Sequence, residues 1–174
     1  MSRIVDWSVP VRLSDVGRGP EARRLEPDEA QRKQIAAALG LAGLPAFSGE
    51  IRLVPWHDGA EIHGRWTAKV TYACGLTLEP FDEDLEGDFT VRAVPPSSPL
   101  AAEDEAAEAE LDLDPEADDP PDVLEGEALD LAGYLIEDLS LSLDPFPRKP
   151  GAVFEPPNLG EPESPFAVLK RLKE

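Results

Sequence analysis

The longest regular alternation of apolar and polar positions lies in residues 61–72. Apolar or small side chains occupy every second position from Ile62 to Tyr72, with Trp66 at the centre. The intervening positions are polar: His63, Arg65, Thr67, Lys69 and Thr71. A period of two is typical of a strand with one buried and one solvated face. The pattern therefore predicts a half-buried strand that ends beside Cys74.

Shorter extended segments flank this strand. Residues 9–11, 47–55 and 88–94 alternate in the same way, and Pro10 suits an edge strand because it lacks a backbone donor. The dipeptide Asp58-Gly59 predicts a tight hairpin turn before the central strand.

Two segments have helical spacing. Pro27 at a first helical position, acidic residues after it and Gly40 as a stop predict one helix over residues 27–39. Asp130 is a suitable N-cap for a second helix, whose apolar positions repeat at helical spacing: Leu131, Tyr134, Leu135 and Leu139. Strands followed by a helix predict an α+β fold, a single small domain with an antiparallel β-sheet covered by one or two helices.

Charge changes this picture in one region. The formal net charge is −20, and residues 103–127 hold 13 acidic residues without Lys or Arg. We interpret residues 96–127 as an acidic, proline-containing disordered insertion within a domain formed by residues 1–95 and 128–155. Residues 156–174 are interpreted as a linker and a short amphipathic basic tail. The insertion is either a solvated linker or a surface that attracts basic chains.

Several functional classes lack their sequence signals. The chain has no signal-peptide pattern and no apolar run of about 18 residues, which favours a soluble cytoplasmic protein. It has no glycine-rich phosphate loop, and Cys74 is its single cysteine. Cys74 with His57 or His63 could form a nucleophilic pair or contact zinc, but a lone cysteine beside a strand is more often a small buried hydrophobe. We predict no enzyme activity, cofactor or metal site.

Residues 144–151 form an unusual segment, Asp-Pro-Phe-Pro-Arg-Lys-Pro-Gly. Prolines at alternating positions favour an extended chain that displays Phe146, Arg148 and Lys149 to a partner. The alternative is a connector that stops the helix and packs on the sheet through Phe146. Both interpretations remain open at this level. The segment's other residues are Asp144, Pro145, Pro147, Pro150 and Gly151.

The C-terminal segment 164–173 has an amphipathic pattern. Pro165 suits a first helical position, and Phe166 and Leu169 lie along one side. Basic residues follow at the end: Lys170, Arg171 and Lys173. Such a short helix is marginal alone, so it docks on its own domain or on a partner.

Another motif follows the central strand: Cys74, Thr77, Leu78, Glu79 and Pro80. By itself it indicates a strand end and a turn fixed by Pro80, or a carboxylate of Glu79 that faces a partner. Together with segments 144–151 and 164–173, and with the weaker match of residues 7–11, it resembles the YceD family of large ribosomal RNA subunit accumulation proteins. Thr77 departs from relatives with further cysteines at this motif, so metal binding does not transfer from them.

The resemblance implies a role in the accumulation of 23S rRNA and of the large ribosomal subunit, without implying a reaction. We therefore expect a ribosome biogenesis factor that binds ribosomal proteins or 23S rRNA, or both, in a pre-50S particle. No membrane or small-molecule partner is expected. A dedicated acidic carrier of one basic ribosomal protein and an RNA-processing enzyme are the alternatives. The candidate contact residues are Phe146, Arg148, Lys149, Phe166, Lys170, Arg171 and Lys173.

Overall fold

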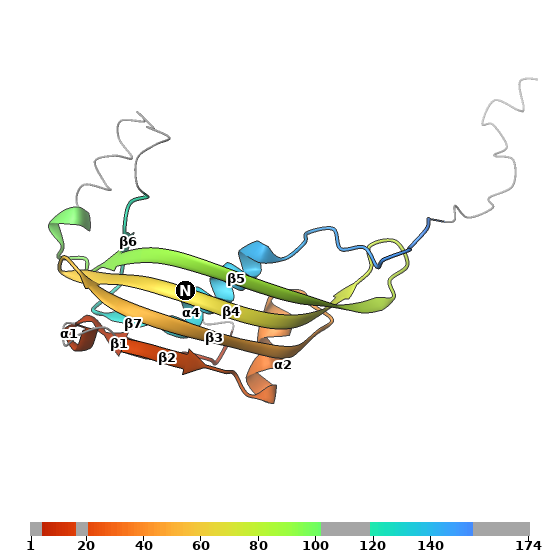
Figure 1. Cartoon of the computed structure of the whole chain (residues 1–174), viewed down its shortest axis with the longest axis horizontal. Helices are drawn as coiled ribbons and strands as arrows, with labels where there is room; N and C mark the ends of the chain where they lie inside the picture. Colours follow the sequence, from red (N-terminus) through yellow and green to blue (C-terminus); the bar gives the residue numbers. More distant parts are fainter. Residues whose placement is uncertain (1–4, 17–20, 102–118, 155–174) are drawn as a thin grey trace, which may run out of the picture.

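A five-stranded sheet forms the framework of the computed structural model, which describes residues 5–16, 21–101 and 119–154 (Figure 1). Its strand order is β2-β3-β4-β5-β6, and β1 and β7 form a separate pair. The strands are β1 (Pro10–Arg12), β2 (Glu21–Leu25), β3 (Gly43–Trp56), β4 (Gly59–Ala73), β5 (Pro80–Val94), β6 (Asp122–Val123) and β7 (Ala128–Asp130). The helices are α1 (Leu13–Val16), α2 (Glu29–Ala38) and α4 (Leu131–Ser142).

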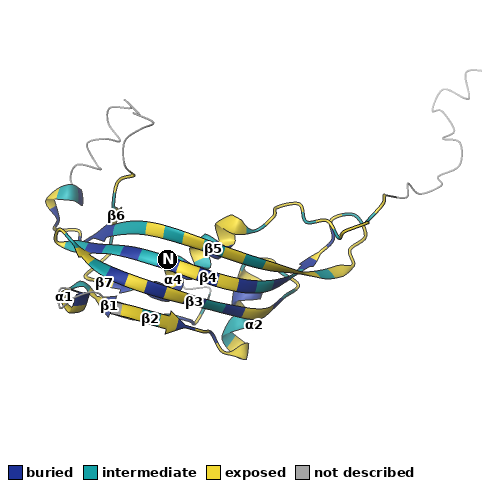
Figure 2. Cartoon of the chain, viewed as in Figure 1, coloured by how far each residue is buried: buried dark blue, intermediate teal, exposed yellow. Residues whose placement is uncertain are grey.

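The predicted central strand is confirmed as β4. Its apolar positions from Ile62 to Tyr72 are all buried, and the polar positions between them face outward (Figure 2). The hairpin turn is displaced by one residue, because β3 ends at Trp56 and His57 takes the positive φ of 50°. Gly59 instead begins β4, where a Cβ would lie 2.0 Å from the carbonyl oxygen of Ala93.

The predicted fold class is wrong in two respects. Strands dominate, since β3, β4 and β5 contain 14, 15 and 15 residues whereas α2 and α4 contain 10 and 12. The main sheet is also mixed rather than antiparallel, because β6 runs parallel to the end of β5. The strand β6 is only two residues long and lies in the acidic region, where proline and charge conceal a strand pattern.

A disordered insertion over residues 96–127 is not shown. At one end of this stretch, Ser98 is buried and its hydroxyl donates to Asp58 Oδ1 at 2.9 Å. At the other end, the amide of Leu124 donates to the carbonyl of Val94 at 3.0 Å. Residues 102–118 lie outside the described residues, and the predicted domain boundaries stay a prediction.

Both longer helices have an aspartate at the N-cap position. Asp28 caps α2 in a capping box with Gln31, so Pro27 precedes the helix rather than occupying its first position. Asp130 occupies the N-cap position of α4, but its side chain does not cap the helix. Its carboxylate accepts hydrogen bonds from Ser8 Oγ and Val9 N, each at 2.8 Å. Asp130 therefore ties the N-terminal segment to the start of α4.

The helix α4 covers one face of the sheet, hereafter the inner face. Leu131, Leu135 and Leu139 are fully buried there. Trp66 in β4 is 1% exposed, and its indole N–H donates to Asp138 Oδ2 of α4 at 2.6 Å. A Cβ on Gly87, directly opposite Trp66 in β5, would lie 2.6 Å from the indole ring. Glycine at this position thus provides the space that the buried indole occupies.

We predict that Gly87→Ala lowers the free energy of unfolding by about 2 kcal/mol, because the buried indole of Trp66 cannot yield to the added methyl group. Gly133→Ala is the matched control: its nearest atoms are 3.8 Å away and it lies in α4, so the free energy should rise by about 0.5–1 kcal/mol. Urea unfolding of both variants measures the difference. Equal stabilities would contradict the proposed packing of Trp66.

Candidate functional site

Two sequence motifs that lie about 70 residues apart meet at the end of the β4–β5 hairpin (Figure 1). The amide of Gly75 donates to the carbonyl of Pro147 at 2.8 Å. The amide of Lys149 donates to Cys74 Sγ at 3.4 Å, and Lys149 Nζ contacts Glu79 Oε2 at 2.9 Å. We call residues 74–80 together with residues 144–154 the motif platform.

The turn between β4 and β5 exposes an apolar side chain to solvent. The amide of Cys74 donates to the carbonyl of Glu79, and that of Leu78 to the carbonyl of Cys74, each at 2.9 Å. Leu78 has a φ of +60°, a conformation that disfavours side chains with a Cβ by about 1 kcal/mol or more. The Leu78 side chain is nevertheless 80% exposed. Neither backbone preference nor burial accounts for leucine here, which marks the position as a functional candidate.

The segment after α4 is a sequence of turns rather than a uniformly extended strip. The amide of Asp144 donates to the hydroxyl of Tyr72, and the Asp144 carboxylate accepts from the amide of Phe146 at 2.8 Å. A second turn joins Ala152 N to Lys149 O at 3.0 Å, with Gly151 at a φ of +78°. The prolines of the segment therefore alternate with bonded positions that anchor it to the end of the sheet.

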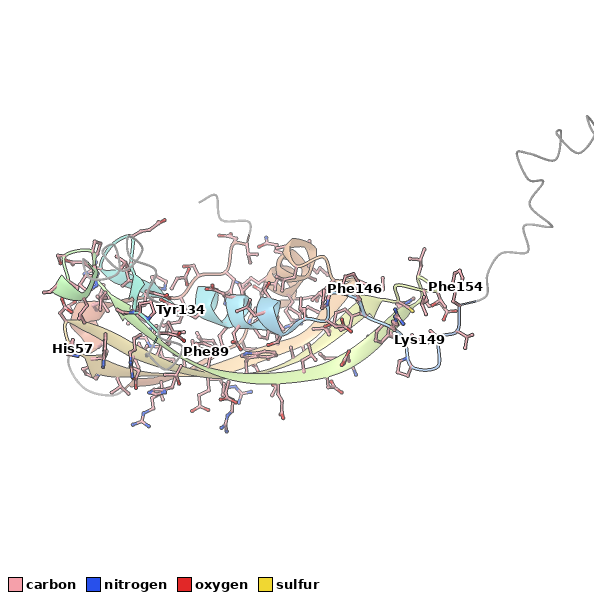
Figure 3. All side chains as sticks on the ribbon, turned by 90° about the horizontal axis from the view of Figure 1, so that it is seen from above. His57, Phe89, Tyr134, Phe146, Lys149 and Phe154 are labelled. Atoms are coloured by element: carbon pink, nitrogen blue, oxygen red, sulfur yellow. The ribbon has the colours of Figure 1, made fainter. Side chains whose placement is uncertain are left out.

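Phe146 does not pack on the sheet, so the connector interpretation is wrong on that point. Its side chain is 79% exposed, and Figure 3 shows it at the same end of the molecule as Lys149 and Phe154. Leu78, Phe146, Val153 and Phe154 are four of the six large apolar side chains that are exposed among the described residues. The motif platform thus gathers apolar side chains in solvent, a feature of interaction surfaces.

The cations and carboxylates of the motif platform are equal in number. Its ionisable cations are Arg148 and Lys149, and its carboxylates are Glu79 and Asp144. Arg148 is exposed, whereas Lys149 is half-buried and paired with Glu79. An exposed ion pair of this kind contributes about 0–1 kcal/mol, so its main effect is to position the Lys149 backbone. The platform therefore offers apolar contact rather than a cluster of phosphate ligands.

The thiol of Cys74 is fully buried within this platform. A hydrogen bond from the Thr77 side chain, followed by backbone N–H groups of Lys149, Thr77 and Leu76, lowers the pKa of Cys74 from its ordinary value of 9.0 to about 6. These donors hold the sulfur in place at the junction of the two motifs. Cys74 therefore acts as an acceptor that joins the hairpin to the segment after α4.

The other candidate partners of Cys74 are far away. His63 lies 11 positions earlier on the same strand, which corresponds to roughly 35 Å, and His57 lies at the opposite end of β4. The structure therefore does not bring these histidines to the thiol. Within residues 5–16, 21–101 and 119–154, no three metal-ligating side chains converge and no helix is long and apolar enough to cross a membrane.

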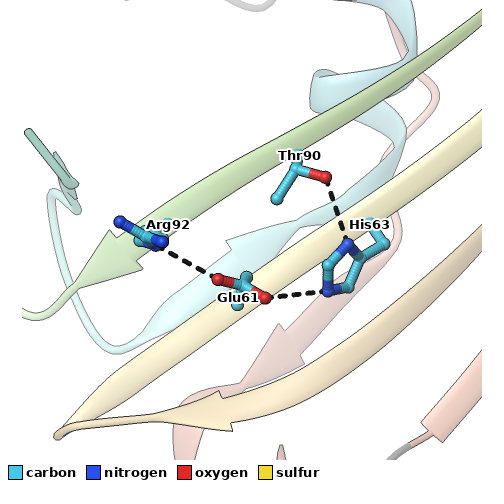
Figure 4. A network of polar contacts seen from close by, with 4 residues as sticks. All are labelled: Glu61, His63, Thr90 and Arg92. Atoms are coloured by element: carbon cyan, nitrogen blue, oxygen red, sulfur yellow. Dashed lines mark hydrogen bonds and ion pairs between the residues drawn. The ribbon is translucent and has the colours of Figure 1, made fainter. Parts of the chain in front are cut away.

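A separate polar network lies on the outer face of the sheet (Figure 4). Glu61 accepts from Arg92 Nε at 3.1 Å and contacts His63 Nε2 at 2.9 Å. His63 Nδ1 lies 3.1 Å from Thr90 Oγ1, and Arg92 lies over the ring of Trp56 at 5.2 Å. A hydroxyl, an imidazole and a carboxylate therefore follow one another. His63 opposes Thr90 and Glu61 opposes Arg92 in the strand register, so ordinary cross-strand pairing accounts for the network.

Both motifs of the platform fall within one family match. A family model described as "Large ribosomal RNA subunit accumulation protein YceD" matches residues 62–173, which is 112 of the 174 residues. The chain belongs to the YceD family. No curated protein and no solved structure matches the chain.

Membership confirms the resemblance inferred from the motifs. The YceD family's description connects the chain with accumulation of the RNA of the large ribosomal subunit. The matched region includes β4 from Ile62 onward, β5, α4 and the whole motif platform. It also includes the C-terminal residues Pro165, Phe166, Leu169, Lys170, Arg171 and Lys173, which lie outside the described residues.

In this YceD family member, the sequence indicated only part of the motif platform. It named Phe146, Arg148 and Lys149 as candidate contact residues and left their display open, and Phe146 and Arg148 are exposed. It did not identify Val153 and Phe154, although two apolar residues after a glycine in a polar segment are a detectable signal. It included Leu78 only as a motif residue, because its positive φ arises from the turn. It interpreted Cys74 as structural, and the buried thiol is consistent with that interpretation.

We predict that Thr77→Val raises the pKa of Cys74, because the largest cause of its lowering is the Thr77 hydrogen bond. Thiolate absorbance between pH 4 and pH 10 should show a midpoint of about 6 in the native protein and a higher one in the variant. Since the folded-state pKa is depressed, the associated stability is present above pH 9 and is lost as the pH falls through about 6. Thr67→Val, on the outer face, should leave the midpoint unchanged.

Proposed function

We propose that this protein supports accumulation of 23S rRNA by binding an assembly intermediate of the large ribosomal subunit through the motif platform. In this proposal it acts by binding and not by catalysis. The family description supports the link to large-subunit RNA. The intermediate, the contact surface and the absence of a reaction are our inference.

One observation carries the proposal: two motifs of the family fold together to hold Leu78 and Phe146 in solvent. Exposing such side chains is unfavourable in an isolated protein, since burying each would contribute about 1.5–3 kcal/mol. The strained turn at Leu78 adds to this cost. Both unfavourable features are accounted for when a partner covers the platform.

The chemistry of the platform favours a protein as the first contact. Tight binding to RNA usually needs several cations on one surface, whereas the platform has two cations balanced by two carboxylates. Exposed aromatic and aliphatic anchors beside an arginine are typical of protein interfaces. Arg148 could still reach a phosphate at the rim of such an interface. Ribosomal proteins on a pre-50S particle are thus the proposed partners, with 23S rRNA contacted locally.

The absence of catalysis is supported by the environment of the available nucleophile. Cys74 has no exposed surface, and its sulfur already accepts hydrogen bonds from the surrounding backbone. A nucleophile must meet its substrate and a base in one cleft. The platform instead combines turns, prolines and apolar side chains, which suit recognition.

We predict that Leu78→Ser and Phe146→Ser each lower recovery of large-subunit ribosomal proteins with the tagged protein at least fivefold. Each variant removes an exposed apolar contact, so stability should change little. Leu141→Ser is the matched control, because Leu141 on α4 is also 80% exposed but lies outside the platform. Quantitative mass spectrometry after a pull-down from growing cells measures recovery, with urea unfolding as the check on folding.

Ribonuclease treatment separates the two kinds of contact. Ribosomal proteins that remain bound after digestion would support protein-mediated recruitment, whereas loss of every partner would overturn the protein-first contact. Equal losses for Leu141→Ser and Phe146→Ser would contradict the assignment of the platform. A 23S rRNA level restored by Phe146→Ser as fully as by the native protein, in cells lacking it, would also contradict the proposal.

A further inference from the structure

The second strand of the hairpin, β5, has a long edge that no described residue pairs. Its residues 80–93 pair with β4 on one side. On the other side, β6 pairs only with Ala93 and Val94. Figure 3, which views the molecule from the β5 side of the sheet, shows this strand running along the near edge. Residues 119–122 lie beside Thr90–Arg92, whereas residues 80–88 have no strand partner on that side within the described part of the chain.

The alternation of hydrogen bonds identifies the residues whose backbone groups face that edge. Cys74 donates to Glu79, so the odd-numbered residues that follow bond to β4 and the even-numbered residues point away from it. Pro80, which lacks a donor, is an even-numbered position. At the other end, the carbonyl of Val94 accepts from Leu124 on the far side of β5. Both ends of the strand thus agree on the same alternation.

The residues whose backbone groups face the edge carry a row of carboxylates. Asp82, Asp84, Glu86 and Asp88 occupy consecutive even positions, and all four are exposed. Because side chains two residues apart share a face, the four carboxylates lie along the outer face of the sheet. We call them the acidic ladder. Glu83 adds a further exposed carboxylate, and residues 80–88 contain no Lys or Arg.

The neighbouring strand neutralises only part of this charge. Asp82 forms an ion pair with Lys69 at 3.8 Å and accepts a hydrogen bond from Thr71. Lys69 is also the strand partner of Asp84, and Arg65 is that of Asp88. Within the described part of the chain, two cations of β4 thus face four carboxylates of β5. The remaining charge lies on the outer face beside the unpaired edge.

We propose that the edge of β5 binds an extended segment of a partner protein with Lys or Arg at alternate positions, which adds to the sheet as an antiparallel strand. Residues opposite the acidic ladder would have their side chains on the outer face and their backbone groups directed at β5. The Cβ atoms of the basic residues would then lie about 4.5–5.5 Å from those of the acidic residues, as in directly opposed cross-strand pairs. One register satisfies both the hydrogen bonds and the charges.

Two other occupants fit less well. A second copy of β5 would place carboxylates against carboxylates, and directly opposed like charges destabilise a strand pair. RNA would bring phosphates to the same carboxylates. Charged residues on an edge also protect a protein from self-association, which is the simplest competing explanation of the acidic ladder. Binding of a basic strand separates the two, since a protective edge alone would not bind it.

The edge lies outside the motif platform apart from Pro80, so this inference does not depend on the proposed function. A peptide experiment can succeed even where the pull-down with Leu78→Ser fails to implicate the platform. If both hold, the basic segment is supplied by a ribosomal protein of the assembly intermediate, and the two surfaces contact it together.

The test uses a fluorescent ten-residue peptide of alternating Lys and Thr and the full-length protein, with anisotropy as the readout. Asp84→Lys with Glu86→Lys should weaken peptide binding at least tenfold. Glu125→Lys with Glu137→Lys is the matched control, because it makes the same change in net charge at exposed residues outside the acidic ladder. That control should weaken binding less than threefold.

Two modified peptides distinguish strand addition from general attraction. Methylation of the Lys amides removes the donors that face β5 and should weaken binding at least tenfold, whereas methylation of the Thr amides should be tolerated. Equal binding of the two methylated peptides would overturn the proposal. So would failure of the unmodified peptide to bind at low salt. A tenfold gain in affinity on removal of residues 162–174 would also overturn it, by assigning the edge to the chain's own basic tail.

Discussion

The burial of Trp66 is the constraint on which the rest of the structure depends. Its indole lies between the sheet and α4, in space left by Gly87, and its N–H is satisfied by Asp138. An indole buried without an acceptor would be strongly unfavourable, so the position of Asp138 determines how α4 lies across the sheet. That position in turn determines where the chain leaves α4, and the Asp144 amide then contacts Tyr72 at the end of β4. The motif platform is therefore a consequence of how the helix is docked.

The local sequence pattern was sufficient to predict elements that have one buried face and one solvent-exposed face. The alternation of β4 predicted its buried residues, and Gly40 ended α2 with the positive φ of 70° that a helix stop favours. The same reasoning failed for the first half of β5, because an exposed edge strand needs little apolar alternation and Glu83 and Gly87 interrupt it. It missed β2 and β7 as well, since their strand character comes from pairing rather than from composition.

The candidate site could be predicted as two motifs but not as one surface. Their convergence depends on hydrogen bonds such as that from Gly75 to Pro147, and no spacing rule relates those positions. The exposure of Phe146 could not be predicted from the sequence either. An aromatic residue between prolines is compatible with packing on a sheet or with exposure to solvent. Phe146 is displayed because the turn at Asp144 directs the chain along the end of the sheet. Tertiary contacts, and not residue preferences, decide this outcome.

The way the motif platform is attached to the sheet affects its local stability. The platform lies at the turn between β4 and β5, the end of β4 that is opposite to the β3–β4 turn. A few backbone hydrogen bonds and one exposed ion pair hold its two segments together there. Segments held in this way open locally at a much lower free energy than global unfolding requires. Amide exchange at Gly75 and Lys149 should therefore be fast relative to exchange in the middle of β4. Any partner that binds the closed platform would slow that exchange. Partner binding and local opening of the platform would therefore be thermodynamically linked.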